Sequence, residues 1–489
     1  MLTTTCRGAG RAFLLLCLAM LALALSPSAA RAAKPEYRVL WVDLFHDGLR
    51  SQAEADTMLE IARSSGYNTI VIEVRKACDA YYNSQMEPRN PAVQKGFDPL
   101  AYIIQQAHGG SPRLQVFTWL VTYRARISGD SMWKNPNHVF QQHPDWLSQK
   151  KGGGKSGSAD TWFLDPGVPQ VIDYNLLVVR DILAHYDVDG IVFDYIRYPE
   201  SDGRGNEWGY NPIAVARFNK LYGHTGQPAT NDPEFSEFRR RQIYDHMRKI
   251  YAHVRAWRPN VKVGAATITW GSLGSDFRQT SAYAEIMQDW PTMTLDGWLD
   301  VVLPMNYKRE DNARQAQDHR DWARFLGQLS ERSGRFGVNI VDGETLNSLQ
   351  GILAQISATR NLPGIDGIST YAYAEPRVGS GRVPDRDFFA AIRKNVFPDN
   401  AVPPDATWLT RPTQGLIKGV VARDGKPVDG ATVTVAGRTT HTDGTGFYAF
   451  ARMDPGNYRV TAQTGSTDLG AVDVSVKAGQ VAEAPISGK

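Results

Sequence analysis

The sequence predicts an α/β protein: a (β/α)₈ barrel of the TIM type followed by a small all-β sandwich. Between residues 36 and 396, eight short apolar runs alternate with amphipathic helical patterns, which is typical of a parallel sheet covered by helices. A Pro-rich polar linker follows at 397–414, and residues 415–489 form short β-branched segments separated by Asp-Gly and Gly-Asn turns. No G-x-G-x-x-G pattern follows the first run, which disfavours a doubly wound nucleotide-binding sheet.

The N-terminus predicts a signal peptide over residues 1–32. Arg7 and Arg11 precede an apolar run at 12–25, and a small-residue stretch leads to an expected cleavage near Ala32. The run is shorter than the ~20 apolar residues of a membrane-spanning helix. We therefore expect an exported protein, periplasmic or secreted, without a transmembrane span in the mature chain. Cys78 is then the one cysteine left, so an intramolecular disulfide is excluded.

The charge balance gives no support to a polyanion-binding role. The chain has 54 Lys and Arg against 51 Asp and Glu, and three of the arginines lie in residues 1–32. The mature chain is therefore neutral, and we expect no nucleic-acid partner.

The eight expected barrel strands cover, in chain order, residues 37–43, 67–74, 114–120, 189–194, 261–268, 299–305, 335–340 and 367–371. Three Asp-Gly pairs, at 189–190, 296–297 and 366–367, predict turns that lead into strands. These turns belong to the N-terminal face of the barrel, opposite the chemistry, and we interpret them as structural.

Barrels of this type carry their active sites at the C-terminal ends of the strands. Carboxylates, aromatic residues, Arg and Asn follow the apolar runs there, without a His or Cys cluster. This composition suits carbohydrate chemistry better than metal or thiol chemistry, so we expect no cofactor and no metal. The candidates for substrate binding are Asp43, Arg75, Trp119, Tyr123, Arg124, Asp165, Arg197, Trp270, Asn306 and Tyr307.

Six ordered motifs resemble a known family. The most specific is Asp189-Gly190-x-x-x-Asp194-Tyr195-x-Arg197-Tyr198-Pro199, and the others lie at 38–42, 68–75, 97–100, 143–146 and 164–167. With these motifs, residues 36–396 resemble the glycosyl-hydrolase-10-like family of exported bacterial proteins (domain of unknown function 187). The resemblance implies a (β/α)₈ glycoside hydrolase, with a relative that acts on peptide-free peptidoglycan strands. Some members carry Gln where Glu73 stands and Asp where Tyr195 stands, so the resemblance assigns neither position a catalytic role.

The C-terminal region resembles the carboxypeptidase-regulatory-like (prealbumin-like) domain family. The matching pieces are Gly430-Ala431-x-Val433 and Asp443-Gly444-x-Gly446-x-Tyr448. The resemblance implies an accessory module that positions the enzyme, through contact with an envelope protein or a glycan.

Glycoside hydrolysis needs two carboxyl groups, one that donates a proton and one that acts as nucleophile or activates water. Asp194 follows a buried strand directly, and we expect it to be the nucleophile or base, with a pKa held down by Arg197 or Arg124. For the acid we rank Glu200, then Glu310, then Glu375.

Three further hypotheses concern the substrate. Asp165 is either a turn residue or a ligand of a sugar hydroxyl. The long segment 128–163 holds Trp133, Phe140, Trp146 and Trp162 and forms either a cleft wall or a local core of its own. One of the rim arginines, at 75, 124 or 197, selects the free lactyl carboxylate of peptide-free glycan.

The sequence thus predicts an exported glycoside hydrolase that cleaves a bacterial cell-envelope glycan, most specifically peptide-free peptidoglycan. One alternative is a hydrolase of another polysaccharide, such as an exopolysaccharide. The other is a catalytically inactive glycan-binding protein.

Overall fold

The computed structural model describes residues 34–201, 208–343, 346–374 and 385–488. The predicted signal peptide and the acid candidate Glu375 lie outside the described residues. In the described ranges, none of the helices has the length and apolar character needed to cross a membrane.

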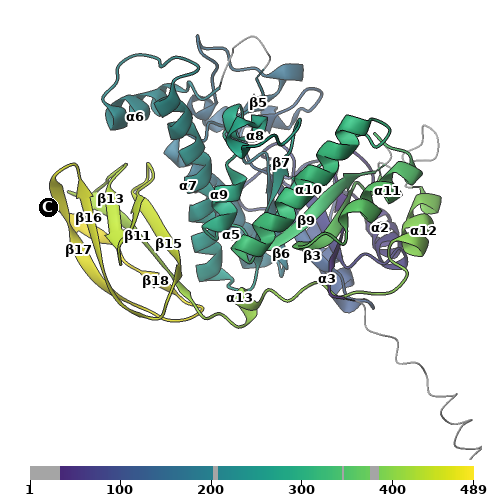
Figure 1. Ribbon diagram of the computed structural model, residues 1–489. Coiled ribbons are helices and arrows are strands. Elements are labelled where there is room, and N and C mark those ends of the chain that lie inside the picture. The colour runs from purple at the N-terminus through teal and green to yellow at the C-terminus, as the bar shows by residue number, and fades with distance from the viewer. Residues whose placement is uncertain (1–33, 202–207, 344–345, 375–384, 489) are drawn as a thin grey trace, which may run out of the picture. The chain divides into compact units, whose positions relative to one another are not determined.

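Eight parallel strands close into a barrel, which confirms the predicted fold class (Figure 1). Each strand pairs with its neighbours in order, and the first closes on the last with Tyr37 opposite Gly367. Every predicted run forms one strand. The strands are β1 (Tyr37–Val42), β2 (Thr69–Arg75), β3 (Gln115–Val121), β6 (Gly190–Asp194), β7 (Lys262–Ile268), β8 (Val301–Met305), β9 (Phe336–Asp342) and β10 (Ile365–Tyr371).

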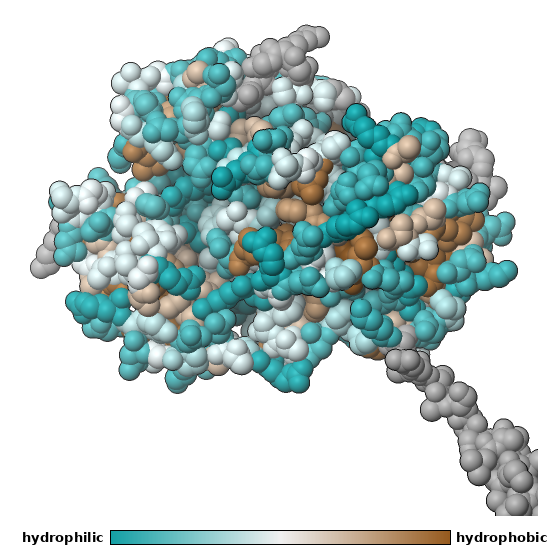
Figure 2. Space-filling view, viewed as in Figure 1, coloured by the Kyte–Doolittle hydropathy of each residue, from teal (hydrophilic) through white to brown (hydrophobic). Residues whose placement is uncertain are grey.

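Amphipathic helices follow the strands and cover the outside of the barrel. Polar caps start many of them: Ser51 accepts a hydrogen bond from the N–H of Glu54 in α2, and Asp98 precedes Pro99 in α3. The outer side of α10 is largely hydrophilic (Figure 2). The helices are α2 (Gln52–Ser64), α3 (Pro99–Gly109), α5 (Pro169–His185), α6 (Pro212–Tyr222), α7 (Pro233–Trp257), α8 (Ser281–Ala284), α9 (Trp290–Leu295), α10 (Ala313–Ser333), α11 (Leu349–Thr359) and α12 (Arg386–Asn395).

The long segment after β3 packs on itself. Trp133 and Trp162 contact Phe140 edge to face, at 5.4 and 5.5 Å between ring centroids, and the Arg126 guanidinium lies 4.1 Å from the Trp133 ring. These rings contact one another but are only partly buried, and Phe140 and Trp162 also pack against the main apolar core, so both predicted alternatives stay open. Its elements are β4 (Arg124–Arg126), η1 (Met132–Lys134), α4 (Val139–Gln142), η2 (Pro144–Trp146), η3 (Ser158–Asp160) and β5 (Trp162–Phe163); η4 (Phe277–Gln279) lies after β7.

The same type of hydrogen bond links neighbouring barrel strands at their N-terminal ends. In each case, the side-chain oxygen of an Asn or Asp near the start of one strand accepts from a backbone N–H of the preceding barrel strand. The four acceptors are Asn68 on Arg38 (3.0 Å), Asp189 on Val116 (2.8 Å), Asp300 on Val263 (2.9 Å) and Asp366 on Gly337 (2.9 Å). Two of the predicted Asp-Gly turns, at 189 and 366, belong to this set. In the third, Asp296 accepts instead from the Tyr244 hydroxyl, and Asp300 joins the strands.

Removing one of these acceptors tests their contribution to stability. In Asp366→Ala, the N–H of Gly337 loses its acceptor, and the Ser330 hydroxyl, 2.8 Å from the carboxylate, keeps only the carbonyl oxygen of Arg335. We expect the free energy of unfolding to fall by about 1–3 kcal/mol. Asp366→Asn keeps an acceptor oxygen, as Asn68 does naturally, and should lose less. Urea denaturation measures both, and equal losses for the two variants would contradict the acceptor role.

The C-terminal region forms two facing sheets, which confirms the predicted β-sandwich. One sheet is built on β11 (Gly415–Arg423), and the other has the order β14–β13–β16–β17. Their inner faces share an apolar core that includes Ile417, Val433, Tyr448 and Val460. The other elements are α13 (Thr407–Thr410) in the linker and β12 (Lys426–Pro427), β13 (Thr432–Val435), β14 (Arg438–His441), β15 (Phe447–Met453), β16 (Gly456–Thr464), β17 (Thr467–Val476), β18 (Val481–Glu483) and β19 (Ile486–Gly488).

Candidate active site

Four carboxyl groups lie at the C-terminal rim of the barrel. Side chains alternate between the two faces of a strand, and each acid stands two residues after a residue of the inner barrel core. The pairs, core residue first, are Trp41 and Asp43, Val71 and Glu73, Val192 and Asp194, and Ile340 and Asp342. All four acids are buried. The parallel strands thus bring acidic side chains that are distant in sequence to one end of the barrel interior.

Asp194 is held by two donors and lies near two arginines. The indole Nε1 of Trp119 donates to its Oδ2 (3.2 Å), and the N–H of Tyr195 donates to its Oδ1 (2.6 Å). Burial raises the pKa of Asp194 above its ordinary value, although Arg197 and Arg124 oppose the shift. The prediction that the arginines hold this pKa down is therefore wrong, because desolvation outweighs their charge. A raised pKa brings the carboxyl group nearer to the working range of a general base.

Glu73 is the acid that sequence reasoning left without a role. Its side chain is completely buried; Oε2 accepts from the N–H of Leu44 (2.9 Å), and Oε1 has no hydrogen-bond partner among the described residues. Burial raises the pKa of Glu73 to about 8, although Arg124, 3.9 Å away, opposes the shift. Glu73 is therefore mainly protonated at neutral pH, the state that a general acid requires.

Glu73 and Asp194 flank Trp119 in the barrel. Strand β3 lies between β2 and β6, with Trp119 in register with Glu73 on one side and Val192 on the other. Adjacent strands are about 4.8 Å apart, so β2 and β6 are separated by roughly 10 Å. Asp194 is in register with Val121, two residues beyond Trp119, and strand alternation directs both acidic side chains inward. Such a pair of carboxyl groups, one of them protonated, is the arrangement that glycoside hydrolysis uses.

Aromatic rings surround these acids. The Trp119 ring lies 5.0 Å from the ring of Trp41 and 6.1 Å from that of Tyr371, which lies 5.7 Å from Tyr307. Tyr307 and Tyr371 are partly exposed, and flat faces of this kind suit the C–H faces of sugar rings, whereas Trp41 and Trp119 are buried in the inner barrel core. The sequence pattern indicated Tyr307 and missed Tyr371, because an aromatic residue inside an apolar run looks like ordinary core.

Two arginines lie on either side of a rim tyrosine. The guanidinium of Arg124 is 4.8 Å from the Tyr195 ring centroid, and that of Arg197 is 4.4 Å from it. Arg197 also lies 5.1 Å from the Trp270 ring. The structure therefore gathers the predicted residues Arg124, Arg197 and Trp270 around one aromatic side chain next to Asp194.

Arg75 is placed differently, in a buried ion pair behind the rim. Its Nε and Nη2 donate to Glu87 at 2.8–2.9 Å, and Nη1 donates to the carbonyl oxygens of Val121 (2.6 Å) and Thr122 (2.9 Å). The guanidinium is thus occupied in joining β2 to the end of β3.

Three more predicted residues are fully enclosed. The Tyr123 hydroxyl shares a short hydrogen bond with His246, and the Asn306 amide donates to the carbonyl oxygen of His319 (2.9 Å). Asp165 accepts from Ser148 and from the N–H of Gly167, both at 2.8 Å, and burial raises its pKa to about 6. These contacts correspond to the turn interpretation of Asp165.

The remaining predicted acids lie at different depths. Asp43 is buried and its carboxylate contacts the His46 ring at 2.9 Å. Glu200 is about half exposed and pairs with Arg197 at 3.1 Å. Glu310 is partly buried, 3.3 Å from Arg320.

Comparison with known proteins identifies both regions. The family model described as glycosyl hydrolase-like 10 matches residues 37–327, and the carboxypeptidase regulatory-like domain matches residues 417–487.

Two curated relatives share the barrel region. Glycosyl hydrolase DigH of Escherichia coli (strain K12) is 26% identical over 281 residues, which cover 53% of this chain and 58% of the relative. Glycosyl hydrolase YngK of Bacillus subtilis (strain 168) is 22% identical over 266 residues, covering 51% and 48% respectively. This chain thus spans only about half the length of these curated relatives.

A solved structure shares the fold. The catalytic domain of the β-amylase from Paenibacillus polymyxa superposes with a TM-score of 0.50 at 13% identity, covering 75% of this chain and 99% of that domain. At this identity the similarity concerns the fold alone.

Proposed function

The chain belongs to the glycosyl hydrolase-like 10 family, and we propose that it hydrolyses the glycosidic bonds of a bacterial cell-envelope glycan, with peptide-free peptidoglycan strands as its substrate. The observation that carries the proposal is the pair of buried carboxyl groups on either side of Trp119. Glu73 has a pKa of about 8, and Asp194 lies between Trp119 and two arginines.

The proposed reaction assigns one task to each group. Protonated Glu73 donates its proton to the glycosidic oxygen as the C–O bond breaks. Ionised Asp194 either attacks the anomeric carbon or takes a proton from the water that does so. Arg124 and Arg197 favour the ionised form of Asp194. Glu200 and Glu310, the acids ranked first from the sequence, remain the alternative proton donors.

Two features support the choice of glycan. The partly exposed aromatic rings of Tyr307 and Tyr371 offer stacking surfaces for sugar rings. Removal of the peptide frees the lactyl carboxylate of N-acetylmuramic acid, and guanidinium groups recognise carboxylates well. Since Arg75 is occupied by Glu87, we assign this recognition to Arg124 or Arg197.

Export belongs to the same proposal. A glycan of the cell envelope lies outside the cytoplasm, and the N-terminal pattern predicts a signal peptide cleaved near Ala32. We propose a periplasmic or secreted enzyme.

Product analysis tests the substrate. The mature protein is incubated with peptide-free peptidoglycan strands, chito-oligosaccharides and an exopolysaccharide, and the products are analysed by mass spectrometry. We expect fragments from the peptide-free strands at the highest rate. Equal turnover of chito-oligosaccharides would contradict recognition of the lactyl carboxylate. Products from the exopolysaccharide alone would indicate a different substrate, and binding without any product would indicate a glycan-binding protein.

A further inference from the structure

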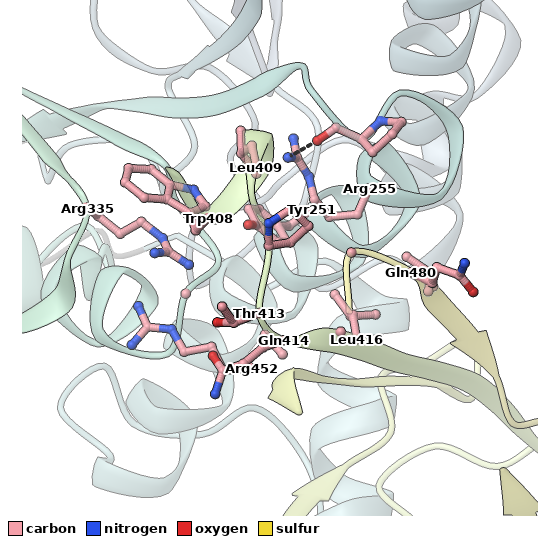
Figure 3. A pocket seen from close by; sticks show the side chains of 17 residues that line it. Tyr251, Arg255, Arg335, Trp408, Leu409, Thr413, Gln414, Leu416, Arg452 and Gln480 are labelled. Atoms are coloured by element: carbon pink, nitrogen blue, oxygen red, sulfur yellow. Dashed lines mark hydrogen bonds between the residues drawn. The ribbon is translucent and has the colours of Figure 1, made fainter. Parts of the chain in front are cut away.

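A pocket with an unusual charge lies near the N-terminal ends of β8 and β9, and Figure 3 shows the side chains that line it. It is formed by the end of α7, the segments before β8 and β9, the linker helix α13 and the first strand of the sandwich, and its volume is about 100 Å³. Three arginines line it, Arg255, Arg335 and Arg452, and none of the described lining residues is acidic.

Two of the guanidinium groups converge on one point. A Cβ atom at Gly297 would lie 2.8 Å from Nε of Arg452 and 3.5 Å from Nη2 of Arg335. Figure 3 shows both groups on the same side of the pocket, below the Trp408 ring, from which the Arg335 guanidinium is 4.5 Å away. Like charges held this close repel each other unless an anion lies between them.

Two carboxylates outside the pocket lining act on these groups, Asp296 on Arg452 and Asp300 on the other two arginines. Asp300 lies behind the pocket, 3.6 Å from Arg255 and 3.9 Å from Arg335. Its oxygens already accept hydrogen bonds from Tyr251, Trp408 and the N–H of Val263. The side chains of Arg255 and Arg335 are only 9% exposed, and within the described part of the chain Nε of each has no hydrogen-bond partner. The other donors are partly satisfied, because Arg255 donates to the carbonyl oxygens of Pro259 and Val261, and Arg335 donates to that of Gly334 (3.2 Å).

Arg452 is held in the pocket by the fold of the sandwich. Its backbone has a φ of +56°, a conformation that non-glycine residues adopt at a cost, and its Nη2 donates to the carbonyl oxygen of Ser333 (2.7 Å). Burial, followed by the charge of Arg335, lowers the pKa of Arg452. A bound anion would raise the pKa of Arg452 again, and it would link the sandwich to the barrel by binding Arg452 and Arg335 together.

The pocket is large enough for a small ligand. Its volume of about 100 Å³ admits a small tetrahedral oxyanion. We propose that Arg335 and Arg452 form a binding site for a phosphate group, either free phosphate or a phosphate of an anionic envelope polymer. Guanidinium groups recognise phosphate by paired N–H donors, and the site joins the barrel to the C-terminal domain.

Calorimetric titration of the mature protein with inorganic phosphate tests the site, with chloride at equal ionic strength as the reference. We expect saturable binding with a Kd of about 1 mM or tighter. Arg452→Gln and Arg335→Gln, which remove one guanidinium from each domain, should each weaken it at least about tenfold. Arg423→Gln is the matched control, because Arg423 is exposed on the same sandwich and has only a 3.9 Å contact with Asp424.

A second titration uses a short glycerol-phosphate oligomer to distinguish the sources. Tighter binding of the oligomer supports a polymer phosphate, and tighter binding of inorganic phosphate supports the free ion. Absence of saturable phosphate binding, or equal binding by wild-type protein and both pocket variants, would overturn the proposal. Neither outcome depends on the glycosidase activity.

Discussion

The Asp194→Asn variant is expected to cleave its glycan about 10²–10⁴-fold more slowly than the wild-type protein, while binding it with similar affinity. Asparagine has the same size as aspartate and keeps one of the two acceptor oxygens that the indole of Trp119 and the N–H of Tyr195 use. It neither attacks the anomeric carbon nor removes a proton from water, so the chemical step is lost and the shape of the site is kept. Product formation under saturating substrate, together with equilibrium binding, measures the two effects separately.

Asp187→Asn is the matched control for this experiment. Asp187 stands at the opposite end of β6, with a side chain 76% exposed, so its activity should remain at the wild-type level. Wild-type turnover by Asp194→Asn would contradict the proposed catalytic role of Asp194. Loss of both turnover and binding would point instead to a structural role.

The Glu73→Gln variant is expected to show a loss of similar size, about 10²–10⁴-fold, on natural glycan. Because burial raises the pKa of Glu73 to about 8, wild-type activity should fall as the pH rises through 8 and the acid loses its proton. The variant has no proton to lose and should lack this fall. Its loss should be smaller on an aryl glycoside, because a good leaving group needs less protonation.

Glu200→Gln and Glu310→Gln belong in the same measurement as the rival proton donors. The acid variant should lose much activity on natural glycan and less on the aryl glycoside. If Glu200→Gln or Glu310→Gln shows this pattern and Glu73→Gln does not, Glu73 is not the acid. A pH profile with the high-pH limb intact in Glu73→Gln would lead to the same conclusion.

Stability provides a readout for Glu73 that is independent of substrate. Since its pKa rises from 4.5 in the unfolded chain to about 8 in the folded one, the folded protein binds this proton more tightly. The resulting stabilisation is fully present below about pH 4.5 and is lost as the pH rises through 8. The melting temperature of the wild-type protein should therefore fall more steeply over this range than that of Glu73→Gln.

Much of the candidate site was predictable because barrel strands are read from local patterns. An apolar run of five to eight residues followed by a polar one places that polar residue at the C-terminal rim, and this reasoning identified Asp194, Trp119 and Tyr307. The same reasoning predicted that Arg75 binds substrate. The local sequence does not show that Glu87 forms an ion pair with the Arg75 guanidinium.

The eight-stranded barrel, the β-sandwich and the family were predictable from the sequence, because apolar periodicity and ordered motifs are properties of neighbouring residues. The tertiary structure was needed to show which acid is protonated, since the pKa of Glu73 depends on burial by several strands and on Arg124. It also decided that Arg335 and Arg452, more than a hundred residues apart, meet beside Gly297. Desolvation and charge proximity are set by packing across the whole chain, and no local pattern records them.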